Sequence, residues 1–341
     1  MKSLITGGCG FVGSNIAARI ASEGGEVAIL DNLSRAGASL NLEWLRSLAP
    51  LKFFHADIRN AHEVEETVRQ TEPDVIFHLA GQVAMTTSVQ DPRKDFEINV
   101  CGTINVLEAA RRHAPEAAII YSSSNKAYGD LGRVALVERA TRYEAPEFPR
   151  GISEDMPLDF HTPYGCSKGA ADQYVLDYAR TFGMNNVVFR HSTIYGARQF
   201  ATFDQGWVGW FCQQALEKKR NPDAAPFTIA GDGKQVRDLL HIDDAVACYL
   251  AAARAIAKAR GQAFNIGGGI ANSCSLLELF HLLEDLLGIQ LQFEKLPWRH
   301  DDQKFFVADH AKATAVMDWS PAVGRDQGIK KAVEWTTERL R

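Results

Sequence analysis

Tyr164 and Lys168 stand four positions apart at the start of a predicted helix, and a run of serines ending at Ser124 follows a predicted strand. Side chains at positions i and i+4 lie on the same face of a helix. A phenol with its ordinary pKa near 10 needs a neighbouring positive charge before it can act as a base near neutral pH. We therefore predict that Tyr164 removes a proton from a substrate hydroxyl, while Lys168 stabilises the phenolate and Ser124 holds the reacting oxygen.

A tyrosine and a lysine at this spacing also occur by chance on helix surfaces, so the prediction depends on a cofactor site nearby. A glycine-rich segment between the first predicted strand and a helix has the spacing of such a site, through Gly7, Gly10, Phe11, Val12 and Gly13. Without Cβ atoms the backbone can approach a pyrophosphate, which the N–H groups of the helix N-terminus attract. Asp31 ends the second strand, where its carboxylate would bind a ribose hydroxyl and repel a 2′-phosphate. The pattern favours NAD over NADP.

Further candidate cofactor contacts follow the second, third and fourth predicted strands or lie on the next helix. They are Asn32, Ser34 and Arg35; Asp57 and Ile58; Leu79, Ala80 and Gly81; and Asn99. For several of these residues ordinary turn chemistry is an equally good interpretation.

Short apolar runs that alternate with amphipathic stretches position these residues. Strands are predicted at 3–6, 27–30, 51–55, 75–79, 119–122, 187–190 and 263–266, with long helices from Pro92 towards Arg112 and from Pro163 to Phe182. This rhythm predicts an α/β fold, a Rossmann-type doubly wound parallel sheet whose ligand lies at the carboxyl edge. Residues 1–190 with about 235–268 are expected to bind NAD, and 191–234 with 269–341 to form a smaller α/β substrate lobe. The polar stretch 129–163 is expected to be a functional loop.

Composition limits the classes of partner. The net charge of −5 gives no broad positive field for nucleic acid, and no apolar run has the length of a membrane helix. The N-terminus lacks the pattern of a signal peptide, so a cytoplasmic location is expected. The six cysteines show no disulfide or zinc spacing, and the histidines show no ligand spacing, so free thiols and no metal are expected.

The glycine segment, Ser122-Ser123-Ser124, Tyr128-Gly129 and Tyr164-x-x-x-Lys168 resemble the extended short-chain dehydrogenases/reductases that modify nucleotide sugars, the NAD-dependent epimerase/dehydratase family. Longer runs are similar to the CDP-paratose 2-epimerases: 31–35, 82–88, 124–126, 161–174, 198–211 and 233–241. This resemblance implies tightly bound NAD, inversion of a CDP-linked dideoxyhexose at C2 to give a CDP-tyvelose product for lipopolysaccharide O-antigen, and a homodimer or homotetramer. The helices from Pro92 and Pro163 are the expected interface.

The implied reaction is chemically consistent with a dinucleotide site. Carbon 2 of a nucleotide hexose is not next to a carbonyl, so oxidation to a 2-keto sugar must come before inversion. Dehydratases of the family carry an acidic residue after the serine or threonine, whereas Asn125 and Lys126 follow Ser124 here, which disfavours dehydration. Gly81 replaces the alanine of most relatives, which is expected to alter packing only slightly.

Arginines are expected to bind the substrate diphosphate, because their planar fork matches phosphate oxygens. The candidates Arg237 and Arg299 lie where the family places such arginines, although each could instead be a surface arginine paired with a nearby carboxylate. The other expected substrate contacts are Thr86, Ser124, Asn125 and His191. Trp207, Trp210 and Phe211 fit a pocket wall and a packed helix face equally well.

Three alternatives remain open at the level of sequence. A UDP-hexose 4-epimerase would share every predicted catalytic residue. The second alternative is a protein that senses NAD without catalysing a reaction. Such a protein would not need Ser124, Tyr164 and Lys168 together, so their presence counts against it. A net reductase with exchangeable NADPH is opposed by Asp31.

Overall fold

A seven-stranded parallel sheet forms the centre of the computed structural model, which describes residues 1–299 and 302–340. The order of its strands places β1 and β4 in the middle, and every neighbouring pair is parallel. Across the sheet the strands are β12 (Gln262–Ile266), β8 (Asn185–His191), β5 (Ala118–Ser124), β4 (Val75–His78), β1 (Lys2–Thr6), β2 (Glu26–Asp31) and β3 (Lys52–His55). All seven predicted strands are confirmed.

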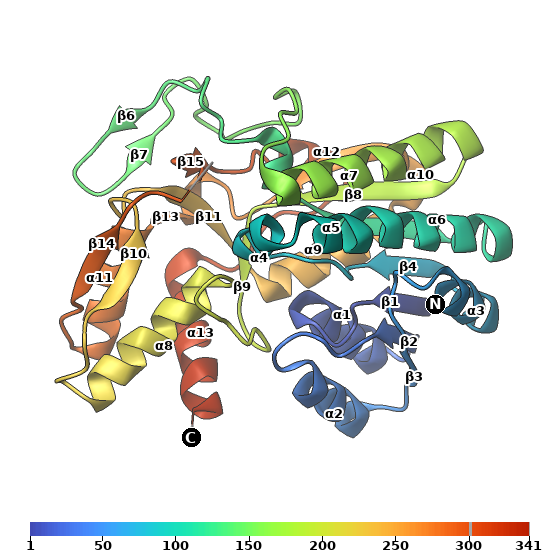
Figure 1. Cartoon of the computed structure of the whole chain (residues 1–341), viewed down its shortest axis with the longest axis horizontal. Helices are drawn as coiled ribbons and strands as arrows, with labels where there is room; N and C mark the ends of the chain where they lie inside the picture. Colours follow the sequence, from blue (N-terminus) through green and yellow to red (C-terminus); the bar gives the residue numbers. More distant parts are fainter. Residues whose placement is uncertain (300–301, 341) are drawn as a thin grey trace.

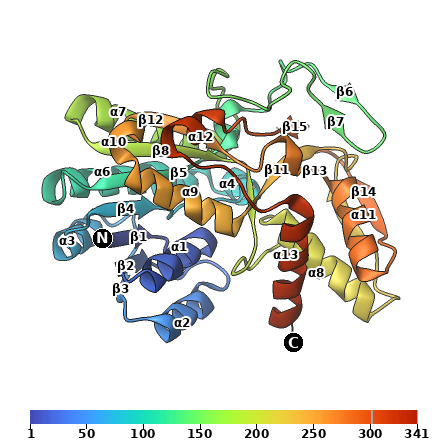
Figure 2. The same cartoon turned by 180° about the vertical axis from the view of Figure 1, so that it is seen from behind.

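The strands are apolar on both faces because helices cover both (Figures 1 and 2). Along β1, Leu4 packs into one buried cluster and Ile5 into the other, as alternation along a strand requires. One face is covered by α3 (Ala61–Thr71), α6 (Gly102–His113) and α7 (Thr162–Phe182). The other is covered by α1 (Phe11–Ser22), α2 (Ala38–Leu48), α9 (Ile242–Arg254), α10 (Ile256–Ala259) and α12 (Ala311–Met317).

The helix predicted from Pro92 is interrupted. After α4 (Met85–Gln90), α5 (Pro92–Phe96) leads through a π-helical turn, Glu97–Cys101, into α6. The π turn contains Asn99, whose side chain accepts a hydrogen bond from Gln82 N at 2.9 Å and donates to Ser167 Oγ at 2.9 Å. Such turns are frequent at functional sites, and this one aims a polar side chain at the end of β4 and at α7.

A second lobe packs beyond the carboxyl edge of the large sheet. Its strands are β9 (Thr193–Tyr195), β11 (Val236–His241), β13 (Ser273–Ser275) and β15 (Phe305–Phe306), with a separate pair β10 (Phe227–Ala230) and β14 (Phe293–Leu296). Its helices are α8 (Trp207–Arg220), α11 (Leu276–Leu287) and α13 (Arg325–Arg339). The strand β11 belongs to this smaller sheet, while α9 and β12, which follow it in sequence, lie with the large sheet. The domain boundaries given above stay a prediction, and Arg341 lies outside the described residues.

The stretch 129–163 packs as a cover on the second lobe. It contains the hairpin β6 (Val137–Glu138) and β7 (Tyr143–Glu144), and its buried Leu131, Val134 and Ile152 share a cluster with Val236 and Phe306. The structure therefore gives this segment a packing role. Over the described residues, no helix is both long enough and apolar enough to cross a membrane. All six cysteines are free, as predicted.

Candidate active site

The three predicted catalytic residues meet at the carboxyl edge of the sheet. Ser124 is the last residue of β5, and Tyr164 and Lys168 lie in the first two turns of α7. The helix starts abruptly because Thr162 adopts a positive φ of 61° and Pro163 occupies its first turn. All three predicted catalytic residues are buried.

Burial favours the neutral forms of Tyr164 and Lys168. It raises the pKa of Tyr164 to about 12, against the opposing effect of the Ser124 hydroxyl. It lowers the pKa of Lys168 to about 7, against the opposing charges of Asp95 and Asp172. The Lys168 ammonium donates to the carbonyl oxygen of Ser122 and lies 4.5 Å from the centre of the Tyr121 ring. Burial therefore opposes the phenolate and the ammonium that the predicted chemistry uses, and the charges of Asp95 and Asp172 favour the ammonium.

A buried ion pair fixes α7 to the sheet. The Arg190 guanidinium of β8 binds both oxygens of Asp172, at 2.8 and 3.0 Å, and Asp172 lies one turn beyond Lys168. Ser123 donates to the same carboxylate at 2.9 Å, next to the catalytic serine. Arg190 also donates to the Tyr128 hydroxyl at 3.0 Å. Breaking such a pair on one side costs about 3–5 kcal/mol, so β5, α7 and β8 hold one relative position.

The glycine segment forms a close-fitting turn between β1 and α1. A Cβ on Gly13 would lie 2.4 Å from Gly7 O, and a Cβ on Gly7 would lie 2.7 Å from Ala80 N. Gly7 also has a φ of 70°, which favours glycine. The Asp31 carboxylate accepts from Cys9 N at 2.9 Å and Leu33 N at 2.7 Å, which holds the turn against the end of β2. This cradle fits a dinucleotide pyrophosphate, with Phe11 and Val12 beginning α1.

The other expected cofactor contacts lie around this cradle. Asn32 donates to Asp57 at 2.9 Å. Arg59, which sequence reasoning missed, also donates to the Asp57 carboxylate and lowers its pKa to about 2. Ser34 N donates to Asn32 Oδ1, and Ile58 is buried beneath α6. Arg35 is exposed by surface area, and the desolvation that lowers the pKa of its guanidinium is opposed by the charge of Asp204.

The end of β4 connects the cofactor side to α7. Leu79 and Ala80 follow the strand, and Ala80 N donates to Thr6 Oγ1 at 3.3 Å. A Cβ on Gly81 would lie 3.0 Å from Asn99 Oδ1 and 3.7 Å from Lys168 Nζ. The missing methyl group therefore leaves space beside the amine, which the sequence alone did not reveal.

His78, buried in β4, makes the protein sensitive to acid. Its ring lies 2.7 Å from Thr6 Oγ1 and 3.0 Å from Thr103 Oγ1, and burial lowers its pKa to about 3. Below pH 6.5 the unfolded chain binds a proton here that the folded chain does not, so stability falls as pH falls towards 3. Between pH 7 and 5 this group alone is expected to remove about 2 kcal/mol from the free energy of unfolding. Urea titrations at both pH values measure the loss, and His78→Asn should lessen it.

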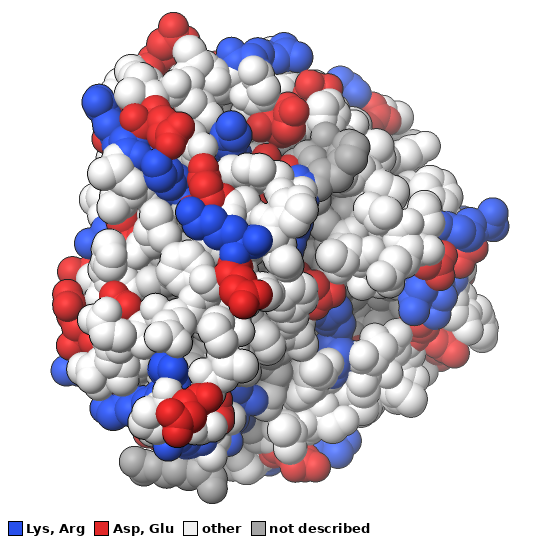
Figure 3. All heavy atoms as spheres, turned by 60° about the vertical axis from the view of Figure 1, so that its left-hand side comes forward, with Lys and Arg blue, Asp and Glu red and all other residues white. Residues whose placement is uncertain are grey.

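A cavity of about 230 Å³ lies between the sheet edge and the second lobe. Of the expected substrate contacts, Asn125, Arg237 and Arg299 line it, as do Trp207, Trp210 and Phe211. Thr86, Ser124 and His191 are not among the lining residues, although Ser124 directly precedes the lining residue Asn125. Thr86 donates to Asp204 at 2.9 Å, and the His191 ring bridges Ser122 Oγ at 3.2 Å and Tyr249 Oη at 2.8 Å. Figure 3 shows basic and acidic side chains interspersed over this side of the molecule, with basic atoms also inside its central recess.

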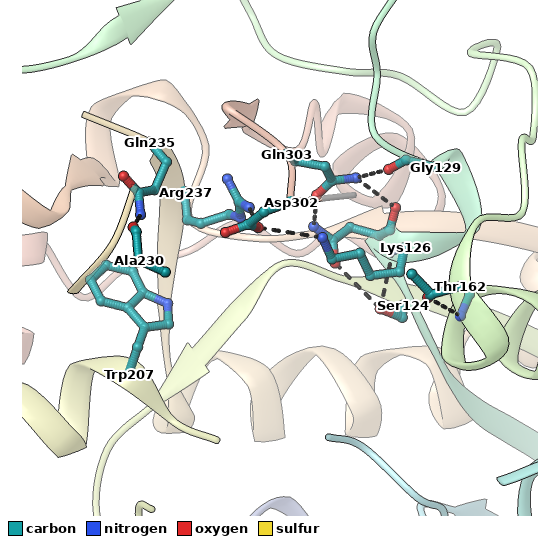
Figure 4. A network of polar contacts seen from close by, with 12 residues as sticks. Ser124, Lys126, Gly129, Thr162, Trp207, Ala230, Gln235, Arg237, Asp302 and Gln303 are labelled. Carbon is teal, nitrogen blue, oxygen red and sulfur yellow. Dashed lines mark hydrogen bonds and ion pairs between the residues drawn. The ribbon is translucent and has the colours of Figure 1, made fainter. Parts of the chain in front are cut away.

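Further polar residues connect the walls of the cavity (Figure 4), and one of them, Asp302, is a carboxylate of the kind expected to pair with the candidate arginines. Asp302 accepts from Arg237 Nη2 at 3.0 Å. Gln303, fully buried, accepts from Asn125 Nδ2 at 2.8 Å and donates to Gly129 O at 2.6 Å. Asp95, another buried carboxylate, lies near both Tyr164 and Lys168. The tract 297–302 pointed to this region, although His300 and Asp301 lie outside the described residues.

Comparisons with known proteins agree with this geometry. The NAD dependent epimerase/dehydratase family model matches residues 3–267. The chain is 57% identical to a CDP-paratose 2-epimerase of Salmonella typhi over 99% of both chains. Its fold is similar to a UDP-glucose 4-epimerase from Thermotoga maritima with UDP-glucose (TM-score 0.85, 29% identity, 100% of both chains). It is also similar to the Thermus thermophilus UDP-glucose 4-epimerase in complex with NAD (TM-score 0.81, 28% identity, 99% of both chains). The chain belongs to the NAD-dependent epimerase/dehydratase family.

Proposed function

We propose that this protein inverts C2 of a CDP-linked hexose, with CDP-paratose as substrate and CDP-tyvelose as product. The observation that carries the proposal is the 57% identity, over nearly the whole of both chains, to a CDP-paratose 2-epimerase. The site supports it, because a dinucleotide cradle, a buried tyrosine and lysine, and a cavity with arginines lie together. We propose in addition that the product is used to make O-antigen sugars and that the protein is cytoplasmic.

In the proposed reaction each predicted residue has a separate role. The glycine cradle and Asp31 would hold NAD, which would supply reversible acceptance of a hydride from C2 and leave no net oxidation. Tyr164 takes the proton of the C2 hydroxyl and later gives it back, while Ser124 hydrogen-bonds that oxygen. Protonated Lys168 stabilises the phenolate of Tyr164. Arg237 and Arg299 hold the diphosphate while the keto sugar turns over.

Substrate identity is tested with the purified protein and no added cofactor. CDP-paratose, CDP-glucose and UDP-glucose are incubated separately, and the configuration at C2 and C4 is followed by proton NMR. Inversion at C2 of a CDP sugar is expected. No inversion of any sugar, even with added NAD, would contradict epimerisation.

A 4-epimerase acting on UDP-hexoses is the second candidate. The observation in its favour is the similarity of the whole fold to UDP-glucose 4-epimerases. Inversion at C4 of UDP-glucose in the same NMR experiment would favour this candidate over the first.

We also propose that the chain forms a homo-oligomer through α5 and α7. Large apolar side chains on this face are exposed, with Phe96 at 49%, Tyr174 at 47% and Phe182 at 50%, and Val89 of the adjacent α4 is exposed at 60%. Neighbouring helices with exposed apolar rows can pair with a second copy as a four-helix interface.

Replacing Tyr174 with glutamate should dissociate this assembly, because a charge would be buried at its centre. Light scattering at micromolar concentration is expected to show a dimer or tetramer for the unaltered protein and a monomer for Tyr174→Glu. Leu48→Glu, at a residue of α2 exposed to 53%, serves as the control and should leave the mass unchanged. A monomeric unaltered protein would contradict the proposal.

A further inference from the structure

Lys126 lies two residues beyond the predicted catalytic serine, on a 3-10 turn, Asn125–Tyr128. Its backbone N–H donates to Ser124 Oγ at 3.2 Å, so the turn and the serine are positioned together. Its side chain is only 13% exposed and lines the cavity. Its ammonium lies 3.6 Å from Asp302 Oδ1. Figure 4 shows these two side chains pointing toward one another.

A second cation converges on the same carboxylate oxygen. Arg237 Nη2, from β11 of the second lobe, donates to Asp302 Oδ1 at 3.0 Å, and burial lowers the pKa of Arg237. Two partly buried cations from different lobes thus contact one carboxylate oxygen. Two cations that converge on one point at the cavity wall are suited to a group that carries more than one negative charge.

The position of the reacting carbon decides where that group must lie. In a nucleotide hexose, C2 is adjacent to the anomeric carbon that carries the diphosphate, whereas C4 lies across the ring from it. When C2 reacts at Ser124 and Tyr164, the sugar-proximal phosphate must therefore lie closer to Ser124 than it does when C4 reacts. Lys126 is a partly buried cation on the turn that immediately follows this serine.

We propose that Lys126 is a specificity-determining residue whose ammonium binds the sugar-proximal phosphate and so places C2 rather than C4 at the reacting position. Asp302 occupies the phosphate position in the ligand-free protein and leaves it when the diphosphate binds, because two negative groups cannot share it. The inference rests on the proposed function, since it takes the substrate to be a nucleotide diphosphate sugar that reacts at C2.

The test compares CDP with CMP, because only CDP carries the phosphate that Lys126 is proposed to bind. In Lys126→Met with NAD bound, the Kd for CDP should rise roughly 30-fold by calorimetry while the Kd for CMP stays unchanged, the size expected for one charge-assisted hydrogen bond. The kcat/KM for C2 inversion of CDP-paratose should fall by about 100-fold. Lys126→Arg keeps the positive charge, so its Kd for CDP and its kcat/KM should lie within roughly fivefold of the values of the unaltered protein.

Lys234→Met is the matched control. The Lys234 ammonium pairs with Glu138 at 2.7 Å and the residue does not line the cavity, so CDP affinity should not change. Asp302→Asn separately tests whether the diphosphate replaces the Asp302 carboxylate. This variant should bind CDP roughly fivefold more tightly, because the competing negative charge is gone. Any of three results overturns the inference. In Lys126→Met, the Kd for CDP is unchanged, or the Kd values for CDP and CMP rise equally. In Asp302→Asn, the Kd for CDP rises. If the unaltered protein binds CDP more tightly than CMP but inverts no C2, the proposed function fails instead.

Discussion

Tyr164→Phe is expected to stop epimerisation while NAD remains bound. The change removes only the hydroxyl, so the ring still fills its buried place at the start of α7 and the glycine cradle is untouched. General acid–base groups contribute roughly 10²–10⁴-fold to rates, and no other phenol in the described site takes this role, so kcat should fall about 10³-fold or more. Proton NMR of CDP-paratose turnover measures the rate, and absorbance of the released cofactor after denaturation measures bound NAD.

Tyr174→Phe is the matched control for this prediction. Tyr174 lies on the same helix at the proposed subunit interface, and the change keeps the ring that packs there, so loss of its hydroxyl should have no effect on kcat. Full activity in Tyr164→Phe would assign the base to another group. Activity that is absent in the unaltered protein despite bound NAD would favour the sensor alternative.

Gly13→Ala is expected to abolish cofactor binding. The new methyl group would lie 2.4 Å from Gly7 O and 2.8 Å from Gly8 Cα, which are backbone atoms that cannot move without opening the turn. Overpacking of this kind costs about 1–3 kcal/mol of stability, and the distorted turn no longer accommodates a pyrophosphate. We expect purified Gly13→Ala to contain no measurable NAD and to have a lower Tm.

Gly324→Ala provides the comparison for that variant. A Cβ at Gly324 meets nothing within 4 Å, and the residue has an ordinary φ of −66°. This variant should keep its NAD and stay within about 0.5 kcal/mol of the original stability. If Gly13→Ala retained full NAD content, the pyrophosphate would have to lie elsewhere.

The large sheet could be predicted because the apolar residues of its strands indicate which segments are buried. In β2, for example, both faces are covered, and the uninterrupted apolar run 27–30 places alternate residues in opposite clusters. The catalytic residues could be predicted for a related reason, because Ser124 follows such a run and parallel strands end at one edge.

Other features depend on contacts between segments that are distant in sequence. The π turn at Asn99 is stabilised by Gln82 and Ser167, which no helical periodicity reveals. The pairing of Asp302 with Arg237 joins residues 65 positions apart. Nothing in the residue types around His191 indicated that its ring would be held between Ser122 and Tyr249.

The buried pair of Arg190 and Asp172 has a consequence for how specificity changes within this architecture. It fixes the strands and helix that carry Ser124, Tyr164 and Lys168, whereas Arg237 and Arg299 belong to the other lobe. Substitutions in that lobe can therefore reshape one wall of the cavity without moving the three predicted catalytic residues. Lys126 lies on the fixed half, so the two halves can change independently: the fixed half would set which carbon reacts, and the second lobe would set which nucleotide is held.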